Sequence, residues 1–305
     1  MYDIALLWMR GSLSFVEKLC VKSFLDAGHR TILYSYEPIG NVPEGVELRD
    51  ASDVLPEEGM LVHERTGSPA PHADLFRYRM LAQHENLIWA DTDAYCVKPF
   101  ETTNGHYHGW ESPTHINVGV LGLPHDSATL AALLDFTSDE FAIPTWYGDR
   151  YTRRLKKAAE AGHPVHTGQQ PWGVWGPHAL THFLHETGEA KFSLPQDVLY
   201  PFTFADRRKI IKAGIDTTRY LTEDTASIHF YGRRMRKHIA QTYEGLPPID
   251  GLLGQLLVKH GIDPLDAPLR DCPVPSPDHP VAKQYREAIH GKVYATMGGK
   301  SSGGV

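Results

Sequence analysis

Two aspartates separated by one residue, Asp91 and Asp93, directly follow a short apolar run at residues 87–90. Such a run is typical of a buried strand, and open α/β sheets bind ligands beyond the carboxyl ends of their strands. Two neighbouring carboxylates repel each other unless a cation neutralises them, and hard divalent cations prefer carboxylate oxygen. The pair therefore predicts a divalent-cation site, although an acidic turn after a strand has the same spacing.

A helix expected at residues 72–83 carries another acid and an arginine. Asp74 and Arg77 lie three residues apart, so both side chains can project from one helix face. A carboxylate can accept hydrogen bonds from sugar hydroxyls, and a guanidinium binds hydroxyl or phosphate oxygens in a planar fork. The pair therefore predicts contacts to a sugar or a phosphate, unless it is an acid favoured by the helix dipole beside a surface arginine.

Asn117 and Gln170 add amide groups that suit a hydroxylated ligand. Asn117 opens an expected strand at 116–123, where Gly119 would allow a ligand or another backbone to approach closely. Gln170 lies in a Gly/Pro-rich loop with two tryptophans, and flat apolar rings beside amides suit a sugar ring. A turn asparagine, and tryptophans that pin a loop to the core, would show the same pattern.

His229 alternates with apolar residues in an expected strand at 226–231, so it could complete a metal site with the acid pair. An imidazole ligand would favour Mn²⁺ over Mg²⁺. A basic run at 233–237 follows, in which Arg233 could meet phosphate oxygens. The chain holds 18 histidines, so a half-buried imidazole without chemistry and a solvated basic helix face are the alternatives.

Composition narrows the classes of protein. The 305 residues carry a formal net charge of −7 at pH 7, which argues against non-specific nucleic-acid binding. The three cysteines are scattered without a Cys-x-x-Cys pair, so neither a disulfide framework nor a zinc site is expected. The first apolar run is too short for a signal sequence, and no stretch approaches the ~20 apolar residues of a membrane span. We therefore expect a cytoplasmic protein without a transmembrane segment, and peripheral membrane contact through an acceptor stays open.

The elements that must position these residues follow an α/β order. A strand at 4–8, a helix at about 15–25 and a strand at 31–36 predict a βαβ unit with a right-handed crossover. Turn-rich sequence follows, and no internal repeat is visible. Further strands are expected at 106–111, 116–123 and 226–231, and further helices at 127–136, 150–161, 178–186, in the basic run and at 249–260. We predict one α/β domain at 1–266, then a Pro-rich extension at 267–305 that ends in a disordered Gly/Ser tail.

Taken together, these elements resemble the GT-A nucleotide-sugar glycosyltransferases with a DxD motif, over about residues 2–243. The closest likeness is to the superfamily of capsular-polysaccharide and α-1,4 glycosyltransferases, initiating mannosyltransferases and clostridial glucosylating toxins. The matching segments occur in the expected order: Trp8 after the first strand, the A-D-L-F-R-Y helix at 73–78, the D-T-D pair at 91–93 with Lys98-Pro99, the N-V-G-V strand at 117–120, the G-P-x-x-L-T segment at 176–181, and His229. Many relatives carry Gly-Gly where this chain has residues 84–86, so the donor sugar stays open.

The resemblance implies a GT-A fold, that is, a Rossmann-like mixed sheet flanked by helices, and a metal-dependent, retaining glycosyltransferase. A nucleotide sugar, with a UDP-sugar favoured, would be the donor, and a saccharide such as a polysaccharide or glycolipid would be the acceptor. The implied roles are metal binding by Asp91, Asp93 and His229 with Mn²⁺ or Mg²⁺; donor binding by Trp8, Asp74, Arg77, Asp91, Asn117 and Arg233; and catalysis by Asp74, Arg77, Asn117 and Gln170.

Three alternatives remain at this point. A nucleotide-sugar hydrolase would use the same donor site with water as the acceptor. A nucleotidyltransferase also couples a metal to a nucleotide, but the chain has no Gly-rich phosphate loop after its first strand. A non-catalytic carbohydrate-binding module would have no use for a metal-bound diphosphate, so dependence on a nucleotide separates it from the enzymes.

Overall fold

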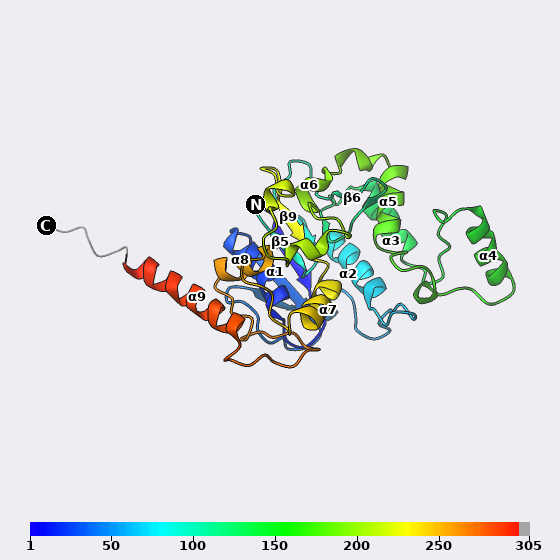
Figure 1. The fold of residues 1–305 in the computed structure, drawn as a ribbon. Coiled ribbons are helices and arrows are strands. Elements are labelled where there is room, and N and C mark those ends of the chain that lie inside the picture. The colour runs from blue at the N-terminus through cyan, green and yellow to red at the C-terminus, as the bar shows by residue number, and fades with distance from the viewer. Residues whose placement is uncertain (299–305) are drawn as a thin grey trace.

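A five-stranded sheet forms the centre of the computed structural model, which describes residues 1–298 (Figure 1). Residues 299–305, which carry most of the predicted Gly/Ser tail, lie outside the described residues. The strand order is β3-β2-β1-β4-β8, and β8 runs antiparallel to β4 while the other pairs are parallel. The predicted α/β fold with a mixed sheet flanked by helices is therefore confirmed.

The chain opens with the predicted βαβ unit, made of β1 (Asp3–Leu7), α1 (Phe15–Asp26) and β2 (Thr31–Ser35). Helix α1 begins where the sequence offers a cap, because the Glu17 carboxylate accepts a hydrogen bond from the Ser14 amide at 3.0 Å. The unit places the carboxyl ends of β1 and β2 at the sheet edge where β4 also ends.

Strand β4 (Leu87–Ala90) is fully buried and stops directly before Asp91. A second, two-stranded sheet follows at once, in which β5 (Ala94–Cys96) pairs antiparallel with β9 (Ser227–His229). In this register Ala94 faces His229, and the Phe230 amide donates to the Asp93 carbonyl at 2.8 Å. Pairing of segments far apart in sequence thus brings His229 next to the acid pair.

Several predicted strands are shorter in the structure. The segment at 106–111 contributes only the start of β6 (Trp110–Ser112), and the one at 116–123 is divided between β7 (His115–Ile116) and β8 (Val120–Leu121). The divided segment contains Gly119 and Asn117, whose side-chain oxygen bonds the Gly119 amide and replaces a ladder bond. An edge strand, β3 (Glu47–Asp50), lies in sequence that was predicted as turns.

The predicted helices are present with ends that differ by a few residues. They are α2 (Ala70–Gln83), α3 (Ala128–Phe136), α4 (Asp149–Glu160), α5 (Pro177–Glu186), α7 (Gly232–Thr242) and α8 (Leu252–Lys259). The structure contains two further helices, the short α6 (Gln196–Leu199) and α9 (Pro280–Gly298). Helix α9 was not predicted, although a proline at its first position is compatible with a helix start. No helix within residues 1–298 combines the length and apolar character needed to cross a membrane.

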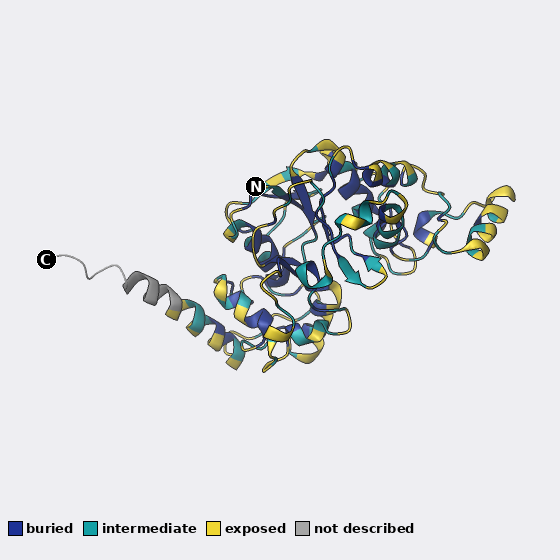
Figure 2. Ribbon diagram, turned by 90° about the horizontal axis from the view of Figure 1, so that it is seen from above, coloured by how far each residue is buried: buried dark blue, intermediate teal, exposed yellow. Residues whose placement is uncertain are grey.

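The core lies on both faces of the central sheet, and Figure 2 shows the buried residues concentrated there. A further cluster of buried residues joins α1, the second sheet, α7 and α8. Helix α4, at the far end of the molecule from α9, is mostly exposed and buries only Leu155 (Figures 1 and 2). The sequence predicted as an extension contributes to the core, because Ala267 and Tyr285 are fully buried in the same cluster as Leu253 of α8. Packing therefore continues past the predicted domain boundary at residue 266.

Candidate functional site

The acid pair lies in the tight connection between β4 and β5. The Asp91 amide donates to the Gly119 carbonyl at 2.7 Å, and the Asp91 carbonyl accepts from the Ala94 amide at 2.9 Å. These backbone bonds fix the connection between the two sheets at the carboxyl end of β4. Both carboxylates therefore have defined positions that do not depend on a flexible loop.

The Asp91 carboxylate is held by two neighbours. Its Oδ1 accepts a hydrogen bond from Trp89 Nε1 at 2.8 Å and lies 3.4 Å from Arg77 Nη2. Burial raises the pKa of Asp91, Arg77 opposes that rise and Asp93 adds to it. One oxygen of Asp91 is thus engaged by protein groups, while Oδ2 points to the neighbourhood of Gly119.

Arg77 crosses from α2 to the sheet as a buried cation, with only 4% of its surface exposed. Its Nη2 lies 3.3 Å from Asp74 Oδ1, its Nη1 donates to the Val118 carbonyl, and its guanidinium stacks 4.8 Å from the centre of the Trp89 ring. Asp74 and Arg77 do share one helix face. Arg77 thus connects the Asp74 and Asp91 carboxylates to the Val118 carbonyl, so it fixes the positions of these groups relative to one another.

Three polar side chains from different segments converge on Gly119. A Cβ at this glycine would lie 3.1 Å from Asn117 Oδ1, and 3.2 Å from both Asp91 Oδ2 and His229 Cε1. Any larger residue would therefore occupy the space between these groups. The Asn117 amide also donates to Glu111 Oε2 at 2.8 Å, which leaves one N–H and one carbonyl lone pair for a ligand.

The predicted metal ligands are close to one another without forming a closed cluster. His229 Nδ1 lies 3.6 Å from Asp93 Oδ1 and is a buried polar atom without a hydrogen-bond partner. Asp93 Oδ2 accepts a hydrogen bond from the Gly232 amide at 2.6 Å. Within the described residues, no three His, Cys, Asp or Glu side chains are close enough together to hold a metal by themselves. Carboxylates and an imidazole are groups of the kind that bind Mn²⁺, and metal binding by these residues stays a prediction.

A cavity of about 410 Å³ is lined by Asp91, Asn117 and His229, whereas Asp93 is not among its lining residues. Two aromatic side chains at its wall, Trp172 and Phe204, are each 48% exposed. Such large exposed rings next to hydrogen-bonding groups suit the face of a sugar. The predicted residues that line this cavity are Asp74, Arg77, Asp91, Asn117 and His229.

Sequence reasoning missed two residues of this cavity, Glu111 and Tyr231. Glu111 accepts from Asn117 and so orients that amide. Tyr231 has a left-handed backbone, with φ of 52°, and its hydroxyl donates to the Phe202 carbonyl at 3.0 Å. A single acid before a turn carries no spacing signal. The tyrosine's backbone conformation is invisible in the sequence, because it is set by the connection from β9 to α7.

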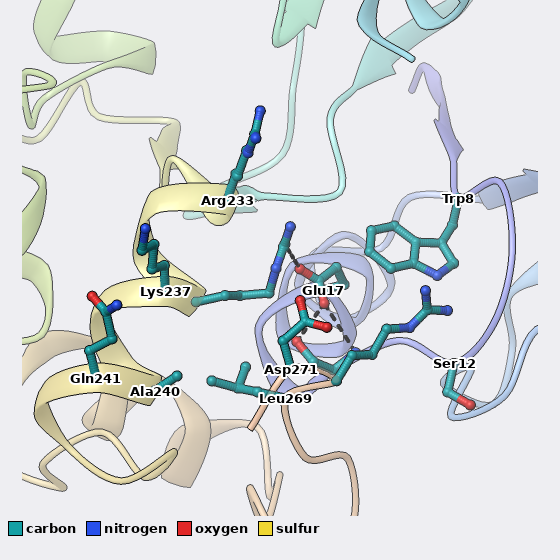
Figure 3. Close-up of a pocket in the computed structure, with 12 residues that line it drawn as sticks. Trp8, Ser12, Glu17, Arg233, Lys237, Ala240, Gln241, Leu269 and Asp271 are labelled. Atoms are coloured by element: carbon teal, nitrogen blue, oxygen red, sulfur yellow. Dashed lines mark hydrogen bonds and ion pairs between the residues drawn. The ribbon is translucent and has the colours of Figure 1, made fainter. Parts of the chain in front are cut away.

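Trp8 and Arg233 lie in a neighbouring cavity of about 510 Å³ between α1, α7 and residues 269–271. Figure 3 shows Trp8 on one side, Arg233 and Lys237 of α7 on the other, and Glu17 between them. At Gly232, the start of α7 approaches the acid pair, because a Cβ there would lie 2.9 Å from Arg236 Nη1 and 3.0 Å from Asp93 Cβ. Asp93 therefore lies close to Arg236, which lines the cavity with Trp8, although Asp93 itself lines neither cavity.

Gln170 is placed apart from the other predicted residues. Its side chain is buried and donates to the Ala142 and Val165 carbonyls, each at 3.1 Å. It is not among the residues that line either of the two cavities. In the structure, this amide holds together the loops that flank α4.

Asp74 provides a pH-dependent test of the site. Burial raises the pKa of Asp74 to about 6, with Arg77 lowering it and Asp91 raising it further. The unfolded chain has an ordinary carboxyl pKa near ~4. Between about pH 4 and pH 6 the native protein therefore binds more protons than the unfolded chain. The resulting stabilisation of the fold is complete below about pH 4 and is lost as the pH rises through about 6.

We expect the difference in unfolding free energy between the wild type and Asp74→Asn to fall by about 2 kcal/mol from pH 4 to pH 6. Urea denaturation at intervals across this range measures it. The difference should stay constant above about pH 7. Parallel curves for the two proteins from pH 4 to pH 6 would contradict the buried, proton-binding carboxyl.

Comparisons with known proteins add little to this geometry. No protein-family model and no curated protein matches the chain. A solved structure titled "PaToxG Glycosyltransferase" is similar with a TM-score of 0.38 and 14% identity, over 62% of this chain and 71% of that one. A likeness of this size carries no argument about activity, so function must be argued from the site itself.

Proposed function

We propose that this protein is a metal-dependent glycosyltransferase that takes its sugar from a nucleotide-sugar donor. The observation that carries the proposal is a pair of cavities lined by neighbouring residues at and just after the end of β9, with His229 and Tyr231 in one and Arg233 in the other. One cavity offers Trp8 and several cations, which suit a base and phosphates, and the other offers carboxylates, an amide and aromatic rings, which suit a sugar. We also propose that the protein belongs to the superfamily of DxD-motif glycosyltransferases that its sequence resembles.

The reaction breaks the bond between the anomeric carbon and the diphosphate oxygen, so negative charge develops on the leaving diphosphate. A bound Mn²⁺ or Mg²⁺, held by Asp93 and His229 with Asp91 nearby, would supply positive charge beside that group. Arg233 stands at the cavity with Trp8 and contributes further positive charge toward the phosphates.

The sugar is assigned to the cavity of about 410 Å³ that Asn117 and His229 line. Asn117, fixed by Glu111 and by the Gly119 amide, presents its remaining N–H and lone pair to sugar hydroxyls. Asp74 is positioned to accept from a hydroxyl when it is ionised. The acceptor hydroxyl is proposed to attack from the face that the diphosphate leaves, and to pass its proton to that diphosphate, which retains the anomeric configuration. The favoured donor is a UDP-sugar and the favoured acceptor a saccharide.

Calorimetry with uridine diphosphate and guanosine diphosphate tests the proposal. We expect binding that requires Mn²⁺, because the diphosphate and the acid pair repel each other without a cation. Ligand at ~100 times its dissociation constant should also raise stability by ~2.7 kcal/mol, measured by thermal shift. Fluorescence quenching should accompany titration in the wild type and diminish in Trp8→Phe, because Trp8 is expected to cover the base.

Other results of these measurements would contradict the proposal or a part of it. Equal affinity in the presence of a chelator would remove the metal from the proposal. No binding of either nucleotide, with binding of free saccharides, would favour a carbohydrate-binding protein. Release of nucleoside diphosphate from a nucleotide sugar with water as sole acceptor, undiminished by any saccharide, would indicate a hydrolase.

A further inference from the structure

The segment after the predicted domain boundary contributes a wall of the Trp8 cavity. Leu269, Arg270 and Asp271 line it opposite α7. The segment is firmly attached, because the Ala267 carbonyl accepts a hydrogen bond from the Phe15 amide at 2.6 Å. That amide is one of the donors at the start of α1 that has no partner within the helix. Leu269 is also 5% exposed and packs in the core.

Arg270 occupies a space that a glycine near the N-terminus leaves free. Its Nη2 donates to the Arg10 carbonyl, and its guanidinium lies 5.6 Å from the centre of the Trp8 ring. A Cβ on Gly11 would overlap Nη2 and lie 2.6 Å from the guanidinium carbon. Gly11 also has a φ of 75°, a conformation that glycine adopts readily. Segments from the two ends of the chain are thus shaped to hold this guanidinium beside Trp8.

The charge of Arg270 is not neutralised by a neighbouring acid. Arg236, in the same cavity, forms an ion pair with the buried Glu17. Within the described residues, no carboxylate lies within 4.0 Å of the charged groups of Arg270, Arg233 or Lys237. Four cationic and two acidic side chains line the cavity, an excess of two positive charges in a protein whose net charge is −7. A local excess of this sign beside an aromatic ring suits an aromatic anion.

We propose that Arg270 binds the phosphate oxygens of the nucleoside diphosphate while Trp8 stacks on its base, so that residues 267–271 are an integral part of the donor site. This inference rests on the proposed function and deepens it. Nη2 is engaged by a backbone carbonyl, which leaves Nη1 and Nε of the guanidinium to donate to a ligand. Arg270 is exposed to the cavity, whereas Arg236 is held by Glu17.

Calorimetry on the full-length protein in Mn²⁺ tests the assignment with uridine diphosphate, guanosine diphosphate and the two nucleosides. Arg270→Gln should weaken nucleoside diphosphate binding by about 10- to 100-fold, the effect of losing a hydrogen bond to a charged group. Nucleoside binding should change by less than about twofold, because Trp8 remains. Lys283→Gln is the matched control, since it removes an exposed cation of the same C-terminal segment that pairs only with Asp278.

A second variant separates the guanidinium's position from its charge. Gly11→Ala keeps every charged group but takes the space of the Arg270 guanidinium, so it should reproduce the loss of diphosphate affinity. Its melting temperature is measured alongside, because alanine at this φ is strained. If Gly11→Ala does not fold, Arg270→Lys replaces it and should recover only part of the affinity, because an ammonium lacks the planar fork.

The outcomes distinguish this inference from the function on which it rests. Wild-type protein that binds neither diphosphate would overturn the proposed function and this inference with it. Wild-type binding that is unchanged in Arg270→Gln would overturn the inference alone. An equal loss of nucleoside and diphosphate affinity would show that Arg270 only supports the Trp8 ring, which would overturn its assignment to the phosphates.

Discussion

Asp93→Asn is expected to abolish Mn²⁺-dependent binding of nucleoside diphosphate and to lower sugar transfer by at least about 100-fold. The carboxylate lies 3.6 Å from the unpartnered imidazole of His229, which lines the cavity of about 410 Å³. Asparagine keeps the shape and can still accept from the Gly232 amide through its oxygen, which Asp93 does at 2.6 Å. The substitution therefore removes charge with little change in packing, and calorimetry with thermal denaturation measures both effects.

Asp224→Asn provides the control, because Asp224 is exposed and lines neither cavity. It should match the wild type in binding and in melting temperature. Asp93→Asn with normal stability and unchanged nucleotide affinity at saturating Mn²⁺ would remove Asp93 from the metal site. A large fall in melting temperature without ligand would instead show that the carboxylate has a structural role through Gly232.

The parts of the fold that could be predicted from sequence are those with a local signal. The first two strands and the strand before Asp91 are short apolar runs, the apolar residues of α1 recur at helical spacing, and a proline stands at the start of α2, so β1, α1, β2, α2 and β4 were all expected. Strand β3 was missed because Glu47–Asp50 is a polar edge strand that pairs with one neighbour only. Its alternating residues look like turn sequence next to Pro43 and Gly45.

The site could be predicted only in part, because its geometry depends on contacts between distant segments. Asp74 and Arg77 share a helix face by simple periodicity, and the structure places them together. Glu111 reaches Asn117 through the short β6–β7 hairpin, and nothing in its spacing marks it. For Gln170, the sequence suggested a ligand because its amide stands beside tryptophans, whereas in the structure its Nε2 donates to two loop carbonyls.

The Trp8 cavity illustrates a further limit. Trp8 was predicted from the family resemblance, and Arg233 was predicted from the basic run that follows the strand at 226–231. Arg270 could not be predicted, because its contact with Gly11 joins residues from opposite ends of the chain. The hydrogen bond between the Ala267 carbonyl and the Phe15 amide, at the start of α1, helps to bring them together. The Pro-rich composition predicted that this segment lies outside the domain, whereas Ala267 and Leu269 are buried in the same core cluster as Leu253 of α8.

Arg77→Lys is expected to damage both stability and function. The guanidinium donates to the Val118 carbonyl, contacts Asp74 and Asp91, and stacks on Trp89, all while 4% exposed. A lysine ammonium keeps the charge, but it cannot donate to the carboxylates and the carbonyl at the same time, and it has no planar face to stack on Trp89. Breaking a buried pair outright costs about 3–5 kcal/mol, so we expect a loss near the lower value, about 3 kcal/mol, measured by urea denaturation.

The effect on transfer should exceed what lower stability explains. Because Arg77 fixes Asp91 Oδ1 and the backbone before Gly119, its loss shifts the groups that converge on the sugar, and kcat/KM should fall by about 100-fold at a temperature where the variant is folded. Arg79→Lys, on the same helix and without a hydrogen bond or ion pair in the described structure, should leave both quantities unchanged. An Arg77→Lys variant with most of the wild-type kcat/KM would show that a point charge suffices here and that the planar contacts to Val118 and Trp89 serve the fold alone.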